Sequence, residues 1–472
     1  MIKRTKIVVT LGPVTANEQM IEKLIKKGVD VFRLNFSHGD HEVHANSIKM
    51  IRDISKKIGK EVAILQDISG PKVRIGEIDG ILHIKKGDTL RLVKKKDDDK
   101  KSTLELSYPE IIDMVNVGEE VFFADGILRT TVIDKDENSL TLRAENDSSL
   151  TSRKGVNFPK TKLEISSITK KDEKDLEFGA KQKVDIVALS FVQTKEDVQK
   201  AKEILKSHDF EPFIVSKIEM GKAVENLDEI LNESDGVMVA RGDLGAEFGV
   251  TKLPRIQKMI LKKANELNKP AITATQMLTT MKENPFPTRA EVSDIANAIL
   301  DGTDAVMLSD ETTVGEFPLE AVQVLVDTIE DIEKGYPYSK PIEATNISEE
   351  ISKSAVNLAK YDNVEALVTF TSTGASARSL SKFRPKEPIY ANTHSLRTHR
   401  VMNLFWGVMP LFVLENPNNP TTLLNDFISQ AKAKGFIKKD KDYVITMGSS
   451  TGISGSTNLI RVLRAKTIEE LA

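Results

Sequence analysis

The sequence contains no cysteine, and this absence excludes several kinds of chemistry. Disulfide bonds, thiolate metal sites and cysteine nucleophiles all require the side chain that the chain lacks. Because disulfides are typical of oxidising compartments, a chain without cysteine fits an intracellular location, and we expect the protein to be cytoplasmic.

A strong net charge and a long apolar segment are also missing. The formal net charge of -3 and the isoelectric point near 6.3 give no field that would attract nucleic acid or an anionic membrane. No apolar run approaches the roughly 18 residues that span a bilayer. The short apolar stretch after Met1–Lys6 is interrupted at Gly12 and Pro13, so it predicts a first strand and not a signal peptide. We therefore expect small-molecule partners, with no nucleic acid and no membrane among them.

What the chain does contain is a regular alternation of strands and helices. Its 472 residues, of which 29% are charged and 40% hydrophobic, suffice for about three globular domains. Eight strand-and-helix units, before and after one interruption, predict an α/β fold in the form of a closed (β/α)8 TIM barrel. In such a barrel the chemistry takes place at the carboxyl ends of the strands. The predicted strands are Ile7–Leu11, Val29–Asn35, Val62–Asp67, Val184–Ser190, Pro212–Lys217, Gly236–Ala240, Ala271–Ala274 and Ala305–Leu308.

Two further domains are predicted from changes in this pattern. Between about Pro71 and Asn157 short alternating strands replace the helices, which indicates a small inserted β-barrel domain placed as a lid on the catalytic side. After Gly335 a proline-containing linker leads into a second alternation of strands and helices, which predicts an open-sheet α/β domain. We expect the catalytic barrel to comprise residues 1–70 and 158–336, the lid 71–157 and the C-terminal domain 337–472.

Charged side chains follow two consecutive barrel strands. Lys217 and Glu219 lie two positions apart at the end of one predicted strand, so they face the same way. Asp243 follows the next strand and supplies a second carboxylate. Two carboxylates with open water positions suit Mg²⁺, and the lysine would then face a substrate phosphate. A structural ion pair at the edge of the sheet explains Lys217 and Glu219 equally well from these residues alone.

Three histidines, His38, His41 and His44, follow one another at intervals of three. This spacing raises the possibility of a metal site, but no acidic or thiolate set of the zinc type accompanies them. We prefer to interpret the segment as a solvated helix start that is capped by Asp40.

Two loops rich in Ser, Thr and Gly follow strands of the predicted C-terminal domain. Free backbone N–H groups and short hydroxyls at a helix start bind phosphate, although such loops also serve as plain helix caps. Neither loop has the Gly-Lys-Ser/Thr ending of a Walker motif. The first loop consists of Thr371, Ser372, Thr373, Gly374, Ala375 and Ser376, and the second runs from Gly448 to Thr457.

Along almost its whole length the sequence resembles pyruvate kinase. The resemblance implies the three-domain architecture described above and the transfer of a phosphoryl group from phosphoenolpyruvate to ADP, which gives pyruvate and ATP in the last step of glycolysis. It rests on dispersed motifs in the order of that family. These are Thr10-Leu11-Gly12-Pro13, Arg33 to Gly39, Asp67 to Arg74, Ser216 to Glu219, Ala240 to Gly245, Ala274 to Leu278 and Val306 to Thr312.

The resemblance implies a role for each charged residue at the strand ends. Glu219 and Asp243 would hold the catalytic Mg²⁺, with Mn²⁺ as a possible substitute. Arg33 and Lys217 would grip the phosphoryl group, because a loose phosphoryl transition state requires positioning and positive charge. The backbone N–H groups of Gly242 and Asp243 would receive the substrate carboxylate at a helix start.

The resemblance also implies a proton-delivery network and a nucleotide side. Thr275, with Ser309 and Glu311 behind it, would belong to the network that protonates the enolate carbon. Asp310 departs from the small residue of many relatives and leaves the local charge around Glu311 open. The positions that match the nucleotide side are Thr10, Pro13, Asn35, His38, Arg74 and Lys171.

A monovalent cation beside the substrate phosphate is not expected here. Potassium-requiring relatives have Thr where this chain has Ile68 and Glu where it has Lys72. A tethered ammonium would supply the positive charge of K⁺ permanently, so we expect that K⁺ is not required; a solvated hinge lysine remains the alternative for Lys72. The matching cation positions are Asn35, Ser37, Asp67 and Ile68.

Regulation and assembly are expected only by analogy with the family. The loop from Thr371 to Ser376 would bind the phosphate of an allosteric activator, and a homotetramer would transmit the effect. The second loop lacks the Trp and Arg of many relatives that fructose bisphosphate activates, so a monophosphate is favoured.

Two other functions stay open. A barrel aldolase or lyase would use Lys217 for a Schiff base. A catalytically inactive sensor of phosphorylated metabolites would need a lost catalytic group, and every position named above is present.

Overall fold

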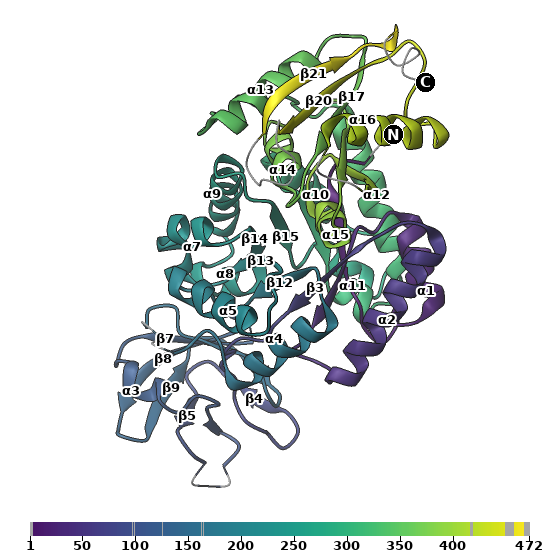
Figure 1. Cartoon of the computed structure of the whole chain (residues 1–472). Coiled ribbons are helices and arrows are strands. Elements are labelled where there is room, and N and C mark those ends of the chain that lie inside the picture. The colour runs from purple at the N-terminus through teal and green to yellow at the C-terminus, as the bar shows by residue number, and fades with distance from the viewer. Residues whose placement is uncertain are drawn as a thin grey trace.

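The computed structural model describes residues 3–96, 98, 100–124, 126–161, 163, 165–415, 419–448 and 457–466. A central barrel carries an inserted sheet domain at one end and a C-terminal α/β domain at the other (Figure 1). The predicted fold, a TIM barrel with an inserted β domain and an open-sheet α/β domain, is therefore confirmed. None of the described helices is long and apolar enough to cross a membrane.

Eight parallel strands close the barrel in the order β1-β16-β15-β14-β13-β12-β3-β2. Their bounds lie within one or two residues of the predicted ones, because Val, Ile and Ala runs bounded by Gly, Asp or Asn define each strand. The strands are β1 (Lys6–Thr10), β2 (Val31–Asn35), β3 (Ala63–Asp67), β12 (Ile186–Leu189), β13 (Phe213–Ile218), β14 (Gly236–Ala240), β15 (Ala271–Ala274) and β16 (Ala305–Leu308).

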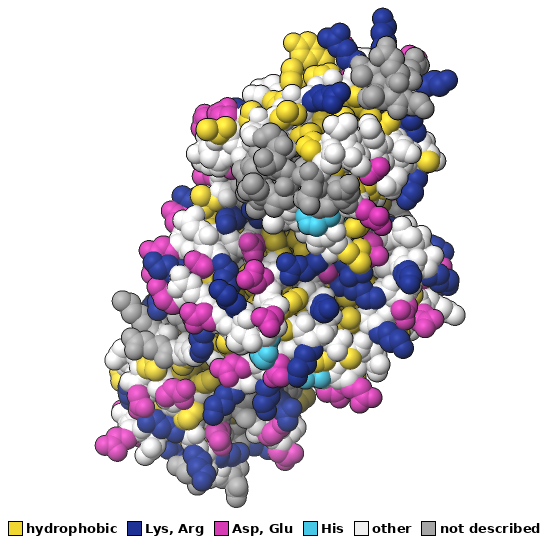
Figure 2. Space-filling view, in the orientation of Figure 1, with side chains coloured by type: hydrophobic (Ala, Val, Ile, Leu, Met, Phe, Trp, Pro, Cys, Tyr) yellow, Lys and Arg dark blue, Asp and Glu magenta, His cyan; other side chains and the backbone are white. Residues whose placement is uncertain are grey.

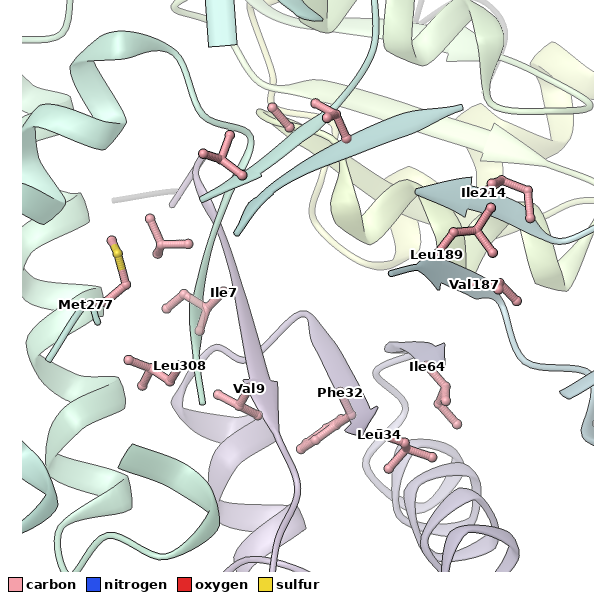
Figure 3. Close-up of a cluster of buried hydrophobic side chains, with 14 of the residues drawn as sticks. Ile7, Val9, Phe32, Leu34, Ile64, Val187, Leu189, Ile214, Met277 and Leu308 are labelled. Atoms are coloured by element: carbon pink, nitrogen blue, oxygen red, sulfur yellow. The ribbon is translucent and has the colours of Figure 1, made fainter. Parts of the chain in front are cut away.

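Side chains alternate between the two faces of each barrel strand. On β1, Ile7 and Val9 belong to the core under the helices, whereas Val8 belongs to the cluster that fills the barrel. Figure 3 shows the outward-facing set, with Phe32 and Leu34 from β2 beside it. Each buried side chain of this kind stabilises the fold by roughly 1.5–3 kcal/mol. At the mouth of the barrel, polar side chains follow the apolar side chains that fill its interior.

Local sequence signals explain where the barrel helices begin and end. In the first helix the Asn17 side chain accepts a hydrogen bond from the N–H of Met20, and Gly28 ends the helix in the left-handed conformation. The barrel helices are α1 (Glu18–Lys27), α2 (His41–Ile58), α4 (Lys170–Gln182), α5 (Lys195–Ser207), α6 (Gly221–Glu225), α7 (Leu227–Glu233), α8 (Arg241–Phe248), α9 (Leu253–Glu266), α10 (Arg289–Asp301), α11 (Asp310–Thr313) and α12 (Pro318–Lys334), with the 3-10 turn η1 (Thr279–Lys282).

In its described residues the inserted domain is all-β apart from one short helix. Its main sheet has the order β11-β7-β8-β9-β5-β6 and curls around its own hydrophobic core, and β10 pairs with β4 beside it. It enters at Val73 and leaves at Val156, whose N–H donates to the Val73 carbonyl at 2.9 Å. The elements are β4 (Leu82–Ile84), β5 (Thr89–Val93), β6 (Thr103–Glu105), α3 (Ile111–Met114), β7 (Glu120–Phe123), β8 (Leu128–Lys135), β9 (Ser139–Ala144), β10 (Ser148–Leu150) and β11 (Val156–Asn157).

The C-terminal domain is a five-stranded open sheet of order β19-β18-β17-β20-β21. Four strands are parallel as predicted, and β21 adds an antiparallel edge strand. This strand was not predicted, because its residues are mostly exposed and its hydrophobic alternation is weak. The elements are α13 (Ile347–Ala359), β17 (Val364–Phe370), α14 (Ala375–Lys382), β18 (Ile389–Thr393), α15 (Leu396–Val401), η2 (Met402–Leu404), β19 (Val408–Val413), α16 (Pro420–Ala433), β20 (Asp442–Gly448) and β21 (Thr457–Leu463).

Candidate active site

Lys217 occupies the centre of a buried charge cluster at the mouth of the barrel. It projects from the end of β13, and its Nζ lies 2.9 Å from Oε1 of Glu219 and 3.2 Å from Oδ1 of Asp67. Nζ also donates to Oγ of Ser190 at 2.7 Å. One ammonium is thus held by side chains from three different strand ends.

Arg33 extends this cluster across the mouth. Its Nε donates to Oδ2 of Asp67 at 2.7 Å and its Nη1 donates to Oγ1 of Thr10 at 2.9 Å. Thr10 in turn donates to the carbonyl of Leu308 at 2.9 Å. Because β1 pairs with both β2 and β16, these contacts fix the guanidinium beside the ammonium of Lys217.

The two carboxyl groups that contact Lys217, those of Asp67 and Glu219, have pKa values shifted in opposite directions. Burial opposes charge on Lys217, but Asp67 and Glu219 outweigh it and raise the pKa of the lysine. Burial also opposes charge on Asp67, yet Lys217 and Arg33 keep the pKa of this carboxyl below its usual value. The pKa of Glu219 is instead raised, by burial first and then by Asp243, against the pull of Lys217. Glu219 is therefore the carboxylate whose charge is least compensated, and a cation beside it would restore the balance.

Asp243 faces the hinge of the inserted domain. Its Oδ1 lies 3.1 Å from Nζ of Lys72, and the stem of Lys72 packs against Gly155 of the returning chain, where an added Cβ would lie 3.3 Å from its Cε. A lysine of the hinge thus reaches a carboxylate of the barrel. Lys72 is expected to bring its ammonium close to the monovalent-cation position, and in the structure this ammonium pairs with Asp243.

Two supporting residues were missed at the sequence level. Ser190 accepts from Lys217 and donates to the Ile68 carbonyl at 2.6 Å. The N–H of Phe191 donates to Oε2 of Glu219 at 2.7 Å, with Phe191 in the left-handed region at φ 55. Ser190 could have been found from the sequence, because it is a serine directly after a barrel strand. Phe191 could not, because it acts through its backbone N–H, for which no sequence signal exists.

Thr275 sits in a two-residue left-handed segment beside the metal-site candidates. Its φ is 69 and that of Gln276 is 53, a conformation that costs free energy unless the surroundings hold it. Arg241, which is buried, holds it by donating from Nη2 to the carbonyls of both residues, at 2.5 and 3.1 Å. Oγ1 of Thr275 accepts from the N–H of Gly242 at 2.9 Å, at the start of α8.

Glu311 supports the loops around Thr275. Glu311 is 2% exposed, and its carboxylate accepts from the N–H of Leu278 at 3.0 Å and from that of Ser309 at 2.8 Å. Asp310 points to the surface, where it pairs with Lys282 at 3.4 Å. The side chain of Asp310 is thus engaged by a lysine, while Glu311 accepts from backbone N–H groups.

The residues of the predicted nucleotide side have different surroundings. Lys171 is anchored by the Phe36 carbonyl and by Asp175, both at 2.6 Å. Nη1 of Arg74 donates to the Arg153 carbonyl in the hinge at 3.0 Å. Pro13 and His38 are exposed. Only Thr10 is brought into the buried cluster.

The predicted monovalent-cation positions are largely engaged with protein groups. Asp67 contacts both cations of the cluster. The side chain of Ile68 lies in the core under the helices, and its carbonyl accepts from Ser190. The Asn35 side chain accepts from the N–H of the exposed Ser37 at 3.1 Å.

The side chains of His41 and His44 have different partners. Nε2 of His41 lies 2.7 Å from Oδ1 of Asp175, and Nε2 of His44 lies 2.9 Å from the His38 carbonyl. The Asp40 side chain accepts from the N–H of Val43, as expected for a helix cap. Within the part of the chain that the structure describes, no group of three or more His, Cys, Asp or Glu is placed to hold a metal ion.

The predicted effector loop forms a tight turn before α14. Oγ1 of Thr371 accepts from the N–H of Gly374 at 3.0 Å, and Gly374 has a φ of 89. Oγ of Ser376 lies 2.6 Å from Oγ1 of Thr457. Of the second predicted loop, residues 449–456 lie outside the described residues.

Comparison with known proteins covers nearly the whole chain. The family model described as pyruvate kinase, barrel domain, matches residues 2–322, and that described as pyruvate kinase, alpha/beta domain, matches residues 349–463. Pyruvate kinase 2 of Synechocystis sp. is 42% identical over 99% of this chain and 80% of its own length. The pyruvate kinases of Staphylococcus aureus (strain MRSA252) and Staphylococcus epidermidis are 39% identical over 98% of this chain and 80% of their own lengths. The chain therefore belongs to the pyruvate kinase family.

Proposed function

We propose that this enzyme transfers a phosphoryl group from phosphoenolpyruvate to ADP with the help of Mg²⁺, as the last step of glycolysis. The observation that carries the proposal is the pair of cations, Lys217 and Arg33, beside carboxylates at the mouth of the barrel. Lys217 and Arg33 both contact Asp67, Lys217 also contacts Glu219, and Asp243 is close enough to Glu219 to raise the pKa of that carboxyl. Two fixed cations beside two metal-ligating carboxylates are what a loose phosphoryl transition state requires.

Each side chain has a distinct task in the proposed reaction. Lys217 and Arg33 bind the transferring phosphoryl oxygens, and their charge counts most in the transition state. Thr275 and the N–H groups at the start of α8, at Gly242 and Asp243, orient the substrate carboxylate. Glu311 and Ser309 hold the loop of Thr275, which orients the proton donor to the enolate carbon. No protein nucleophile is needed.

The carboxylates suit a divalent cation. Glu219 is buried with incompletely compensated charge, and Asp243 already has the ammonium of Lys72 at 3.1 Å in the position of a counter-ion. Mg²⁺ prefers one or two carboxylates plus substrate phosphate and water. When held by Glu219 and Asp243, the ion would supply positive charge to neutralise phosphate; Mn²⁺ suits the same ligands.

The charge state of Lys217 argues against the Schiff-base alternative. A lysine that forms an imine must lose its proton readily, so such lysines have a lowered pKa. Here the pKa is raised by two carboxylates. Borohydride should therefore trap no substrate on Lys217.

The deciding experiment is a coupled assay that follows pyruvate formation from phosphoenolpyruvate and ADP in the presence of Mg²⁺. Turnover that requires both substrates and the metal supports the proposal. An enzyme that binds these substrates without turnover would favour the inactive-sensor alternative.

We further propose that K⁺ is dispensable, because Lys72 brings a permanent positive charge to the metal-binding edge of the site. Regulation by a phosphorylated metabolite at the loop from Thr371 to Ser376, in a homotetramer, rests on family membership and on the helix start that follows this loop. We also retain the division into a barrel (1–70 and 158–336), a lid (71–157) and a C-terminal domain (337–472).

A further inference from the structure

The helix α10 carries two carboxylates that hold the loop after β15, the loop in which Thr275 lies. Asp294 pairs with Arg241, whose Nη1 donates to Oδ2 of Asp294 at 2.5 Å. Glu291, one turn earlier on the same face of the helix, accepts from the N–H of Thr280 at 2.8 Å and from its hydroxyl at 2.5 Å. The helix is thus connected to the loop near its start, through Arg241, and near its end, through Thr280.

Arg241 links Asp294 to the main chain that follows β15. Its Nε donates to the carbonyls of Ala274 and Thr275 at 3.2 and 3.1 Å. Its Nη2 donates to the carbonyls of Thr275 and Gln276 at 2.5 and 3.1 Å. One guanidinium therefore binds three consecutive carbonyls, and the carboxylate of Asp294 holds this guanidinium from the opposite side of the contact.

The segment that Arg241 binds has a backbone conformation that requires support. Thr275 and Gln276 both lie in the left-handed region, which residues with a Cβ seldom occupy unless their surroundings hold them there. The conformation matters for the site, because it brings Oγ1 of Thr275 to the N–H of Gly242 at 2.9 Å. This is the place at which the proposed reaction orients the substrate carboxylate.

The pair of Arg241 and Asp294 differs from an ordinary surface ion pair. Acidic and basic side chains intermingle over the face of the molecule shown in Figure 2, and exposed pairs of this kind contribute little. The side chain of Arg241 is only 6% exposed, whereas that of Asp294 is 41% exposed and reaches it from the surface. Without Asp294, the buried guanidinium would lose the carboxylate that compensates its charge, so it would move toward water and away from the carbonyls.

We propose that Asp294 is a positioning residue for the substrate carboxylate. It fixes Arg241, Arg241 fixes the left-handed backbone of Thr275, and Thr275 with the start of α8 orients the carboxylate of phosphoenolpyruvate. The inference rests on the proposed function and deepens it, because it assigns part of the affinity for this substrate to a residue outside the charge cluster at the mouth. A purely structural role of Asp294 would instead affect stability, or both substrates alike.

The test is calorimetric titration of the enzyme with phosphoenolpyruvate in the presence of Mg²⁺, beside steady-state kinetics of the coupled assay. Asp294→Ala should weaken the binding of phosphoenolpyruvate about tenfold and raise its KM to a similar extent, because a charge-assisted hydrogen bond is lost. The KM for ADP should change less than about twofold, because the loop of Thr275 serves the other substrate. Asp294→Glu should recover most of the affinity, since it restores a carboxylate at a partly exposed position.

The exposed Glu283→Gln, between η1 and α10, is the control and should leave both substrates unaffected. Equal weakening of phosphoenolpyruvate and ADP, or a lower unfolding temperature with unchanged affinity, would mean that Asp294 only stabilises the fold and would overturn the inference. Should Asp294→Ala fail to fold, Asp294→Asn takes its place. The asparagine keeps an acceptor oxygen without the charge, so it should weaken phosphoenolpyruvate alone and by a smaller factor.

The outcomes separate this inference from the function on which it rests. Calorimetry requires no turnover, so a wild type that binds phosphoenolpyruvate without forming pyruvate overturns the proposed function, while the affinity of Asp294→Ala still decides the role of Asp294. If the wild type forms pyruvate and Asp294→Ala binds phosphoenolpyruvate equally well, the inference is overturned and the function stands. A wild type that does not bind phosphoenolpyruvate overturns both.

Discussion

Both ends of the barrel contain a buried cation on buried carboxylates, but the partners differ. At the mouth, Lys217 is held by the side chains of Asp67, Glu219 and Ser190. At the floor, Arg384 of the C-terminal domain donates to Asp304, which in turn accepts from the backbone N–H groups of Ala271 and Trp406. At the floor the carboxylate of Asp304 accepts from two backbone N–H groups, whereas at the mouth the ammonium of Lys217 is held by side chains alone.

This difference indicates what each cluster is for. Backbone donors and a cation at the floor satisfy Asp304 within the fold, as they do for Glu333, which accepts from the N–H groups of Arg4 and Thr5 at 2.9 and 2.7 Å. The mouth keeps carboxylate and ammonium groups that can exchange partners when substrate arrives. Substitutions at the floor should therefore cost stability, and substitutions at the mouth should cost turnover.

The largest effect is expected for Arg384→Met at the floor. Arg384 is 1% exposed, contacts Asp304 at 3.1 Å and lies over the ring of Trp406 at 4.9 Å. Removal of one partner of a buried pair leaves an uncompensated charge and destabilises by about 3–5 kcal/mol. Urea unfolding followed by fluorescence measures it directly, because Trp406 is the single tryptophan.

Lys386→Met, at an exposed position two residues away, is the control and should leave the unfolding midpoint unchanged. The folded fraction of Arg384→Met should keep wild-type kcat. A loss of kcat with unchanged stability would contradict the assignment of the floor cluster to folding.

The next effect is the loss of turnover in Lys217→Met. A charge that acts mainly in the transition state should lower kcat roughly a hundredfold or more and affect KM less. Steady-state kinetics of the coupled assay measure both, with the exposed Lys222→Met on the neighbouring helix as control. Because Asp67 keeps Arg33, the loss of stability should be smaller than in Arg384→Met. A variant that keeps a tenth of wild-type kcat would overturn the role of Lys217.

The same contrast explains how much of the fold could be predicted from the sequence. Short apolar runs bounded by turn residues are local signals, so the barrel strands were placed within one or two residues of their observed bounds. The edge strand Thr457–Leu463 was missed because half-exposed edge strands carry little alternation. Pairings between distant segments, such as Arg384 with Asp304, have no local signal.

The candidate site was predictable to a similar extent. Polar residues directly after buried strands indicated Lys217, Glu219 and Asp243. Their ion-pair partners could not be predicted, because the flexible side chain of a lysine can reach several carboxylates. Lys72 contacts Asp243 and not the positions expected for a monovalent cation.

Lys72→Gln tests that contact and should have opposite effects on metal binding and on catalysis. Without the competing ammonium on Asp243, Mn²⁺ should bind the substrate-free enzyme more tightly, by up to about tenfold. Electron paramagnetic resonance of free Mn²⁺ measures this affinity without turnover. Catalysis should fall, because the variant lacks the tethered charge, and added KCl should restore part of it.

The exposed hinge lysine Lys154→Gln is the control for both measurements. In the wild type, the rate in a buffer with only a bulky organic cation should change less than about tenfold on addition of K⁺. A larger rise would show that the chain requires K⁺ after all, and unchanged Mn²⁺ affinity in Lys72→Gln would show that Lys72 and the metal do not compete.

The smallest effect concerns Glu247, where lid and barrel meet. Burial raises the pKa of this carboxyl from 4.5 to about 7, against hydrogen bonds from Gly221 and Asn157. The folded state therefore holds the proton more tightly than the unfolded state, so the contribution to stability is complete below about pH 4.5 and is lost as the pH rises through about 7. Glu247→Gln imitates the protonated form and should raise the free energy of unfolding at about pH 8 by about 1 kcal/mol after allowance for partial exposure, with the difference vanishing toward acid pH. Thermal unfolding across this range, with the exposed Glu225→Gln as control, measures it. An equal gain at all pH values would mean that the glutamine improves packing and that no proton is involved.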